Sequence, residues 1–214
     1  PPDAPCPFEV LVGTSAGALN AAALAARASR FEEAVGQLEQ TWSGFRVAQV
    51  VRSDAGTVLQ AGLHWAISML TGGWLLPPPR SLLDTSPLRE LLQKVIPLER
   101  IPASIAAGPV KALAVATTSY STGQAVAFFE AVPSIREWSR VRRAGVRRTI
   151  DLDVLMASSA IPFLFPSARV DGDYYGDGDM RQLAPLSPAV HLGANRVLVV
   201  GTRAESAASP ADGS

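Results

Sequence analysis

Gly13-Thr14-Ser15-Ala16-Gly17 is a short stretch whose residue types could carry out nucleophilic catalysis. It lies between an apolar segment, 8–12, and an alanine-rich segment with strong helix-forming tendency, 19–26. This order predicts a strand, a sharp turn with the serine at its apex, and a helix whose positive end faces the serine hydroxyl. We expect a side chain in place of either glycine to clash with the strand and the helix. The pattern favours Ser15 as a nucleophile, and the alternative is a serine that only caps a helix.

A serine nucleophile needs a general base, which is most often a histidine, and the sequence has two histidines. His64 lies within an apolar segment of helical periodicity, 57–70, which favours a role in packing. His191 follows Asp177, so the chain order is the Ser, Asp, His order of α/β-hydrolases, but it lies inside a helical pattern. A Ser-Asp-His esterase or thioesterase is therefore one alternative.

The densest group of carboxylates is the segment 171–179, in which aspartates alternate with glycines and tyrosines. A calcium-binding loop would need a glutamate that closes the loop with both carboxylate oxygens, and none follows at the required spacing. We therefore expect no metal site. One carboxylate of this segment, held by a glycine turn against the serine hydroxyl, is a better candidate for the base.

Strand-like and helical patterns alternate along the chain, which predicts an α/β fold with a sheet covered on both faces. Beyond the turn at Ser15, the strand-like segments are 110–117, 124–129, 168–170 and 196–201, and the first two form a hairpin through the turn 120–123. The helical segments are 31–42, 57–70, one that begins near 84–87, 151–157 and 187–192.

The composition is that of a globular protein, with 48% hydrophobic and 18% charged residues. The formal net charge is zero, which gives no reason to expect a nucleic acid as partner. The single cysteine, Cys6, excludes an internal disulfide. No apolar run approaches the roughly 18 residues that span a bilayer, and no signal peptide is visible. We expect a cytoplasmic or peripheral membrane protein.

The chain resembles the patatin-like phospholipases. The resemblance extends from Phe8 to Thr202, and its motifs become specific when they are taken together. The matching segments, in chain order, are Val12–Ala21, Ser81–Leu88, Ala157–Pro166, Val170–Gly172, Asp177–Gly178, Ala184–Ala189 and Leu192–Ala194.

This resemblance implies a three-layer α/β/α fold with a mainly parallel central sheet and a nucleophile elbow. It also implies a serine–aspartate dyad without cofactor or metal, in which Ser15 is the nucleophile and Asp177, followed by Gly178, is the base. The backbone N–H of Ala16 would bind the oxyanion. The implied function is a lipid acyl hydrolase of the phospholipase A or lysophospholipase kind, acting on phospholipids or other fatty-acyl esters.

The sequence departs from the family pattern at two points. Asp179 occupies a position where the family has a small residue, so a second carboxylate follows the base. The family also has a glycine-rich oxyanion loop after its first strand, and nothing before Gly13 matches it. We expect residues 1–203 to form a patatin-like domain that lacks this strand and loop, followed by a flexible tail, 204–214. A lipid-binding regulatory module with impaired catalysis is the other alternative.

Two segments could contact a lipid surface. The first is the apolar segment 63–76, which could form an interfacial flap or pack in the core. The second is a group of six arginines around Trp138, between Arg136 and Arg148, which suits anionic headgroups or a solvated loop.

Overall fold

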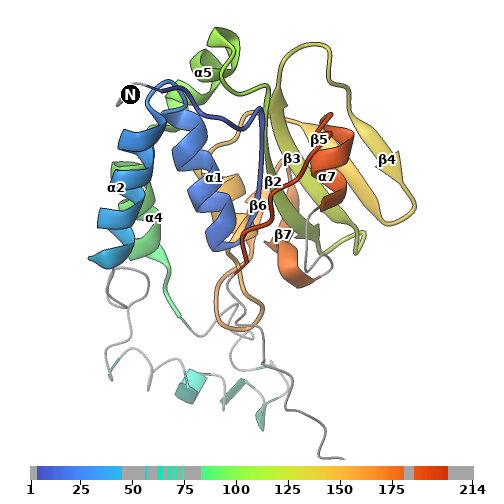
Figure 1. Cartoon of the computed structure of the whole chain (residues 1–214). Helices are drawn as coiled ribbons and strands as arrows, with labels where there is room; N and C mark the ends of the chain where they lie inside the picture. The colour runs from blue at the N-terminus through green and yellow to red at the C-terminus, as the bar shows by residue number, and fades with distance from the viewer. Residues whose placement is uncertain are drawn as a thin grey trace, which may run out of the picture.

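The structure is a computed structural model, and it describes residues 4–44, 56, 62–64, 67, 68, 70, 71, 74, 83–180 and 186–201. The tail 204–214 and parts of the segment 63–76 lie outside the described residues. The elements (Figure 1) are, in chain order, β1 (Val10–Thr14), α1 (Ala16–Ala26), α2 (Phe31–Ser43), α4 (Ser86–Val95), η2 (Leu98–Arg100), α5 (Ile101–Ala107), β2 (Ala112–Ser119), β3 (Ala125–Ala131), β4 (Trp138–Arg140), β5 (Arg143–Arg147), α6 (Leu152–Ser158), β6 (Ala168–Val170), β7 (Asp173–Asp177), η3 (Gly178–Met180) and α7 (Leu186–His191).

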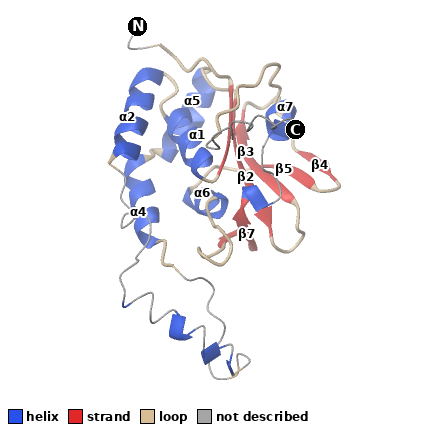
Figure 2. Cartoon of the chain, turned by 60° about the horizontal axis from the view of Figure 1, so that its bottom comes forward, coloured by secondary structure: helices blue, strands red, loops and turns tan. Residues whose placement is uncertain are grey.

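Strand β2 is the organising strand of the sheet, whose order is β4-β5-β3-β2-β7-β6 with β1 also paired to β2 (Figure 2). β3 pairs along one edge of β2. The other edge is shared, because β1 pairs with the first part of β2 and β7 pairs with its last three residues. All eight residues of β2 are buried, as expected for a strand paired on both edges and covered on both faces.

The α/β class is confirmed, but the expectation of a mainly parallel sheet is wrong for the described strands. Only β1–β2 and β3–β5 are parallel, whereas the other four pairings are antiparallel. The reason is the short connections, since β2–β3, β4–β5 and β6–β7 are each joined by a tight turn, which can link only antiparallel neighbours.

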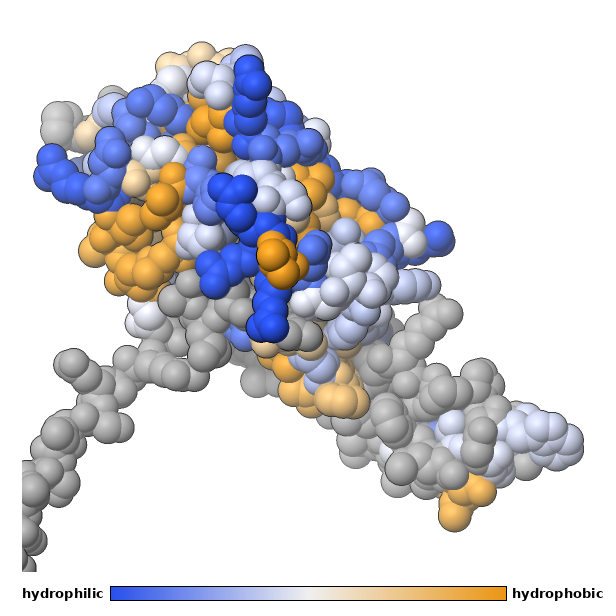
Figure 3. Space-filling model, turned by 90° about the vertical axis from the view of Figure 1, so that its right-hand side faces the viewer, coloured by the Kyte–Doolittle hydropathy of each residue, from blue (hydrophilic) through white to orange (hydrophobic). Residues whose placement is uncertain are grey.

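The arginine-rich segment contains the hairpin β4–β5 at one edge of the sheet, where the sequence analysis expected no strands. Figure 3 faces this side of the molecule and shows hydrophilic side chains spread over it. The strands pair from Trp138 opposite Gly145 to Arg140 opposite Arg143. A Cβ at position 145 would lie 2.3 Å from the Trp138 ring, so this pairing requires glycine.

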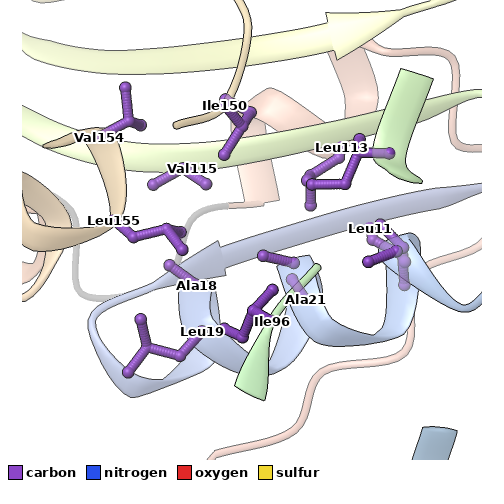
Figure 4. Close-up of a cluster of buried hydrophobic side chains, with 14 of the residues drawn as sticks. Leu11, Ala18, Leu19, Ala21, Ile96, Leu113, Val115, Ile150, Val154 and Leu155 are labelled. Atoms are coloured by element: carbon purple, nitrogen blue, oxygen red, sulfur yellow. The ribbon is translucent and has the colours of Figure 1, made fainter. Parts of the chain in front are cut away.

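The core lies mainly between the sheet and the layer of helices to which α1 and α6 belong. Figure 4 shows Leu113 and Val115 of β2 together with side chains of α1 and α6. Most buried residues of α1 are alanines, which let the helix lie close to the sheet. On the other face, Leu192 after α7 packs with Phe129 of β3. Helices therefore cover both faces, which gives the three-layer α/β/α arrangement.

The expected strand at 196–201 is not formed, and these residues have no regular secondary structure. Val197, Leu198, Val199 and Val200 have exposures from 45% to 89%. An apolar segment of this kind is stable as a strand only when a neighbour takes its hydrogen bonds and covers its side chains, and no described strand pairs with it.

Candidate active site

Ser15 lies at the tight turn between β1 and α1, as the sequence predicts. Its backbone has φ 51° and ψ −128°, in a region that residues other than glycine rarely adopt. Such a conformation costs about 1–3 kcal/mol and persists only where the surrounding structure enforces it. The turn leaves Ser15 partly exposed at the positive end of an eleven-residue helix.

The two glycines of the turn have different environments. A Cβ at Gly13 would lie 2.2 Å from the carbonyl oxygen of Gly17 and 2.5 Å from the Cα of Ala18, so any side chain at position 13 would collide with the start of α1. A Cβ at Gly17 would meet no described atom within 4 Å. The expected clash is thus found at Gly13, and at Gly17 it is wrong because the first turn of α1 faces outward there.

Ser158, at the end of α6, anchors the turn from below. The backbone N–H of Ser15 donates to Ser158 Oγ at 3.0 Å, and this hydroxyl donates to the carbonyl oxygen of Ala116 in β2 at 2.7 Å. Ser158 is fully buried. The sequence analysis assigned Ser158 no role. The signal that could have found it is an apolar helical segment that ends in two serines, Ser158 and Ser159.

Asp177 reaches Ser15 because two strands end at neighbouring positions on β2. β1 runs parallel to β2 and ends with Thr14 opposite Ala116. β7 runs antiparallel to β2 and ends with Asp177 opposite Thr117, the next residue. The carboxyl ends of β1 and β7 therefore meet, and the Ser15 hydroxyl lies close enough to the carboxyl group of Asp177 to lower its pKa.

The carboxyl group of Asp177 lies in a buried environment that raises its pKa. The residue is 5% exposed, and desolvation is the largest cause of the shift. Hydrogen bonds from the Asp179 backbone N–H, at 2.9 Å from Oδ1, and from Ser15 act in the opposite direction. The charge of Asp179 adds a smaller upward contribution.

Asp179 and Gly178 follow the carboxylate with different roles. Asp179 is exposed, so solvent screens the repulsion between the two carboxylates. Its backbone N–H donates a hydrogen bond to Asp177 Oδ1, which stabilises the carboxylate. A Cβ at Gly178 would lie 2.5 Å from Thr14 Oγ1 and 2.6 Å from the carbonyl oxygen of Ala116, so the close meeting of the two strands requires glycine.

The other aspartates of the segment are engaged elsewhere. Asp173 accepts hydrogen bonds from Ser119 and Ser121, at 2.9 and 2.7 Å. Asp171 forms an ion pair with Arg148. Asp177 is thus the member of this segment that contacts Ser15.

Tyr120, which the sequence analysis passed over, lies near the carboxylate. A Cβ at Gly176 would lie 2.6 Å from its hydroxyl. Burial raises the pKa of Tyr120, and the negative charge of Asp177 raises it further. The phenol therefore stays protonated and can donate a hydrogen bond near the reacting groups.

The amides of the first turn of α1 are available to a ligand. Ala16 and Gly17 are exposed, and within the described residues neither N–H donates to a backbone carbonyl. Unpaired amides at a helix N-terminus bind anionic groups. The N–H of Ala16, directly after the serine, is one of these two amides.

The histidines are not joined to this pair by any hydrogen bond among the described residues. His191 Nδ1–H donates to the Ser187 carbonyl oxygen at 2.8 Å, and its ring stacks on Trp138 with centroids 4.9 Å apart. These contacts hold it as a packing residue of α7. His64 lies in a helical piece, 62–64.

A family model described as patatin-like phospholipase matches residues 2–190, which include Ser15, Asp177 and the whole described sheet. A search of the curated proteins gave no match.

Proposed function

The chain belongs to the patatin-like phospholipase family, and we propose that it hydrolyses fatty-acyl esters of lipids through a Ser15–Asp177 dyad. The family supports a lipid acyl hydrolase in general terms. The observation that supports the dyad is the meeting of β1 and β7 on neighbouring residues of β2, because it brings Ser15 beside the buried carboxylate of Asp177.

The proposed reaction has two halves. Asp177 accepts the proton of the Ser15 hydroxyl while the oxygen attacks the ester carbonyl, and the protonated Asp177 then gives its proton to the departing alcohol. In the second half, water loses a proton to Asp177 and attacks the acyl-serine, and the proton returns to Ser15 as the fatty acid leaves. A raised pKa makes Asp177 a stronger base than an ordinary aspartate, which this mechanism requires.

The oxyanion of each tetrahedral intermediate would be bound by the N–H of Ala16 at the N-terminus of α1. One good oxyanion donor contributes about 10²–10³ in rate. A second oxyanion donor would come from a glycine-rich loop, in keeping with our proposal that residues 1–203 form a patatin-like domain. Within the described residues no strand pairs with the outer edge of β1, and Val197–Val200 are exposed. A strand on this edge, followed by a glycine-rich loop beside Ser15, would complete the oxyanion hole.

The experiment that tests the proposal is covalent labelling by a fluorophosphonate together with release of fatty acid from a soluble short-chain ester. Ser15→Ala should abolish both signals, and Asp177→Asn should lower the hydrolysis rate by about 10⁴ if it acts as the base. Ser139→Ala, an exposed serine in β4, is the matched control and should behave as the unmodified protein.

Retention of labelling by Ser15→Ala would exclude Ser15 as the nucleophile. Labelling of the unmodified protein without ester turnover would favour the lipid-binding module with impaired catalysis, since the nucleophile would then be active but the oxyanion hole incomplete.

A further inference from the structure

The tip of the β4–β5 hairpin carries three exposed arginines, Arg140, Arg142 and Arg143, around Val141, which is 92% exposed. None of the ion pairs among the described residues involves these arginines. The side of the molecule in Figure 3 includes this hairpin and shows hydrophilic atoms interspersed with hydrophobic patches. We call residues 140–143 the cationic tip.

Arg136 is also exposed, whereas Arg147 and Arg148 differ because the fold uses them. Arg147 donates to the carbonyl oxygens of the last residue of β3 and of two residues in the β3–β4 connection, and it lies over the Phe129 ring at 5.2 Å. Arg148 forms ion pairs with Asp151 and Asp171. Trp138 stacks between Phe129 and His191, so it is not available to enter a membrane. Unpaired positive charge is therefore concentrated at the cationic tip.

The strand register puts the cationic tip at the same end of the sheet as the catalytic pair. Arg143 lies opposite Ala125, Ala125 opposite Thr118, and Thr118 opposite Gly176, next to Asp177. Three strand spacings separate Arg143 from β7, which is about 14 Å across the sheet. A flat surface could contact the tip and the entrance to Ser15 together.

An exposed apolar loop lies directly beside Asp177. The Asp177 N–H donates to the carbonyl oxygen of Ala160 at 3.0 Å, and the chain then continues through Ile161, Phe163 and Leu164, which are 40%, 74% and 42% exposed. Phe163 has φ 66°, a costly conformation for a bulky residue, and it gains little burial in return. Backbone strain that displays an aromatic side chain to solvent beside a reactive carboxylate points to a role in binding.

We propose that this end of the molecule docks on an anionic lipid bilayer. In this arrangement the cationic tip binds the phosphates of the headgroups, and the 161–164 loop enters the interface beside Ser15. The inference rests on the proposed function, because it explains how an ester at a lipid surface reaches the dyad. Within the described residues no helix is long and apolar enough to cross a bilayer.

The test is flotation of Ser15→Ala protein with vesicles of phosphatidylcholine, with and without phosphatidylglycerol. The inactive variant separates docking from turnover. Each basic residue near an anionic membrane strengthens binding about fivefold, so Arg140→Gln, Arg142→Gln and Arg143→Gln together should weaken binding to the anionic vesicles about 100-fold. Added salt should remove most of the difference.

The matched control removes three exposed cations outside the cationic tip, through Arg30→Gln, Lys94→Gln and Arg100→Gln. Arg30 precedes α2, Lys94 lies in the last turn of α4, and Arg100 ends η2. Its binding should change far less than that of the tip variant. Equal loss in both variants, or equal binding of the starting protein to both kinds of vesicle, would overturn the proposal.

The apolar loop is tested by Phe163→Gly, which removes the side chain and suits the positive φ. It should weaken vesicle binding at high salt as well as at low salt, with no loss of thermal stability. Unchanged binding would exclude the loop from the docking surface. The two proposals can fail separately. If vesicle binding follows these expectations but the unmodified protein has no esterase activity, the dyad is refuted and the docking surface stands.

Discussion

Asp177 shows how a single side chain acquires a property that its residue type does not have. An isolated aspartate has a pKa of about 3.9 and is a weak base toward serine. Here burial raises the pKa, while the hydrogen bonds from Asp179 N–H and Ser15 limit the rise by stabilising the carboxylate. The net effect is a raised pKa, so the Asp177 carboxylate is more basic than that of an ordinary aspartate.

The pH dependence of the reaction should follow this carboxylate. A base is active when deprotonated, so kcat/KM for a soluble ester should fall as the pH drops through the pKa of Asp177. Because that pKa is raised, the acidic limb should lie above the usual value of about 3.9. Measurement in His191→Ala should give the same limb, since His191 is held by Ser187 and Trp138. A limb near pH 6.5 that disappears in this variant would support the Ser-Asp-His alternative instead.

At the scale of elements, the two glycines in the turn between β1 and α1 differ in how closely other atoms pack against them. Gly13 is packed against the backbone of α1, and the elbow is tied to α6 through Ser158. Gly17 is a helical position open to solvent. The two glycines look equivalent in the sequence, but the packing of β1 against α1 leaves no room for a side chain at Gly13 and leaves room at Gly17.

This difference predicts opposite effects of two matched substitutions. Gly13→Ala should lower the free energy of unfolding by about 3 kcal/mol or more, because its Cβ would overlap backbone atoms that cannot move aside. Gly17→Ala should raise it by up to about 1 kcal/mol, because alanine is the better helix former. Urea denaturation of both variants checks this. Equal destabilisation would mean that Gly17 is also packed.

The elements differ in how far the sequence anticipates them. Segments with strong periodicity or clear end signals were predicted well, such as α6, where Asp151 caps the helix by accepting from Val154 N–H. The β2–β3 hairpin was also predicted from its turn. The hairpin β4–β5 was missed because exposed edge strands rich in arginine lack the alternation that marks a half-buried strand.

At the scale of the whole molecule, β2 organises both the core and the site. It carries β3 along one edge and the ends of β1 and β7 along the other, with helices on both sides of the sheet. The segment 197–200 lies apart from this network, since its apolar side chains are exposed and no described backbone group bonds to it.

Hydrogen exchange should reveal this contrast. Amides of β2 should exchange most slowly, because they open only when the core opens. Amides of residues 197–200 should exchange within the fastest class, as measured by mass spectrometry on peptic fragments. Strong protection of 197–200 would show instead that this segment is paired, as expected if a strand occupies the outer edge of β1.

The sequence by itself determined the strand, turn and helix around Ser15 and predicted this serine as the nucleophile, because these local signals lie together in the chain. It also limited the base to a short acidic segment. Only the tertiary structure decided that Asp177 is the carboxylate in contact with Ser15. That choice depends on β1 and β7 ending at neighbouring residues of β2, and pairing between segments so far apart leaves no local mark in the sequence.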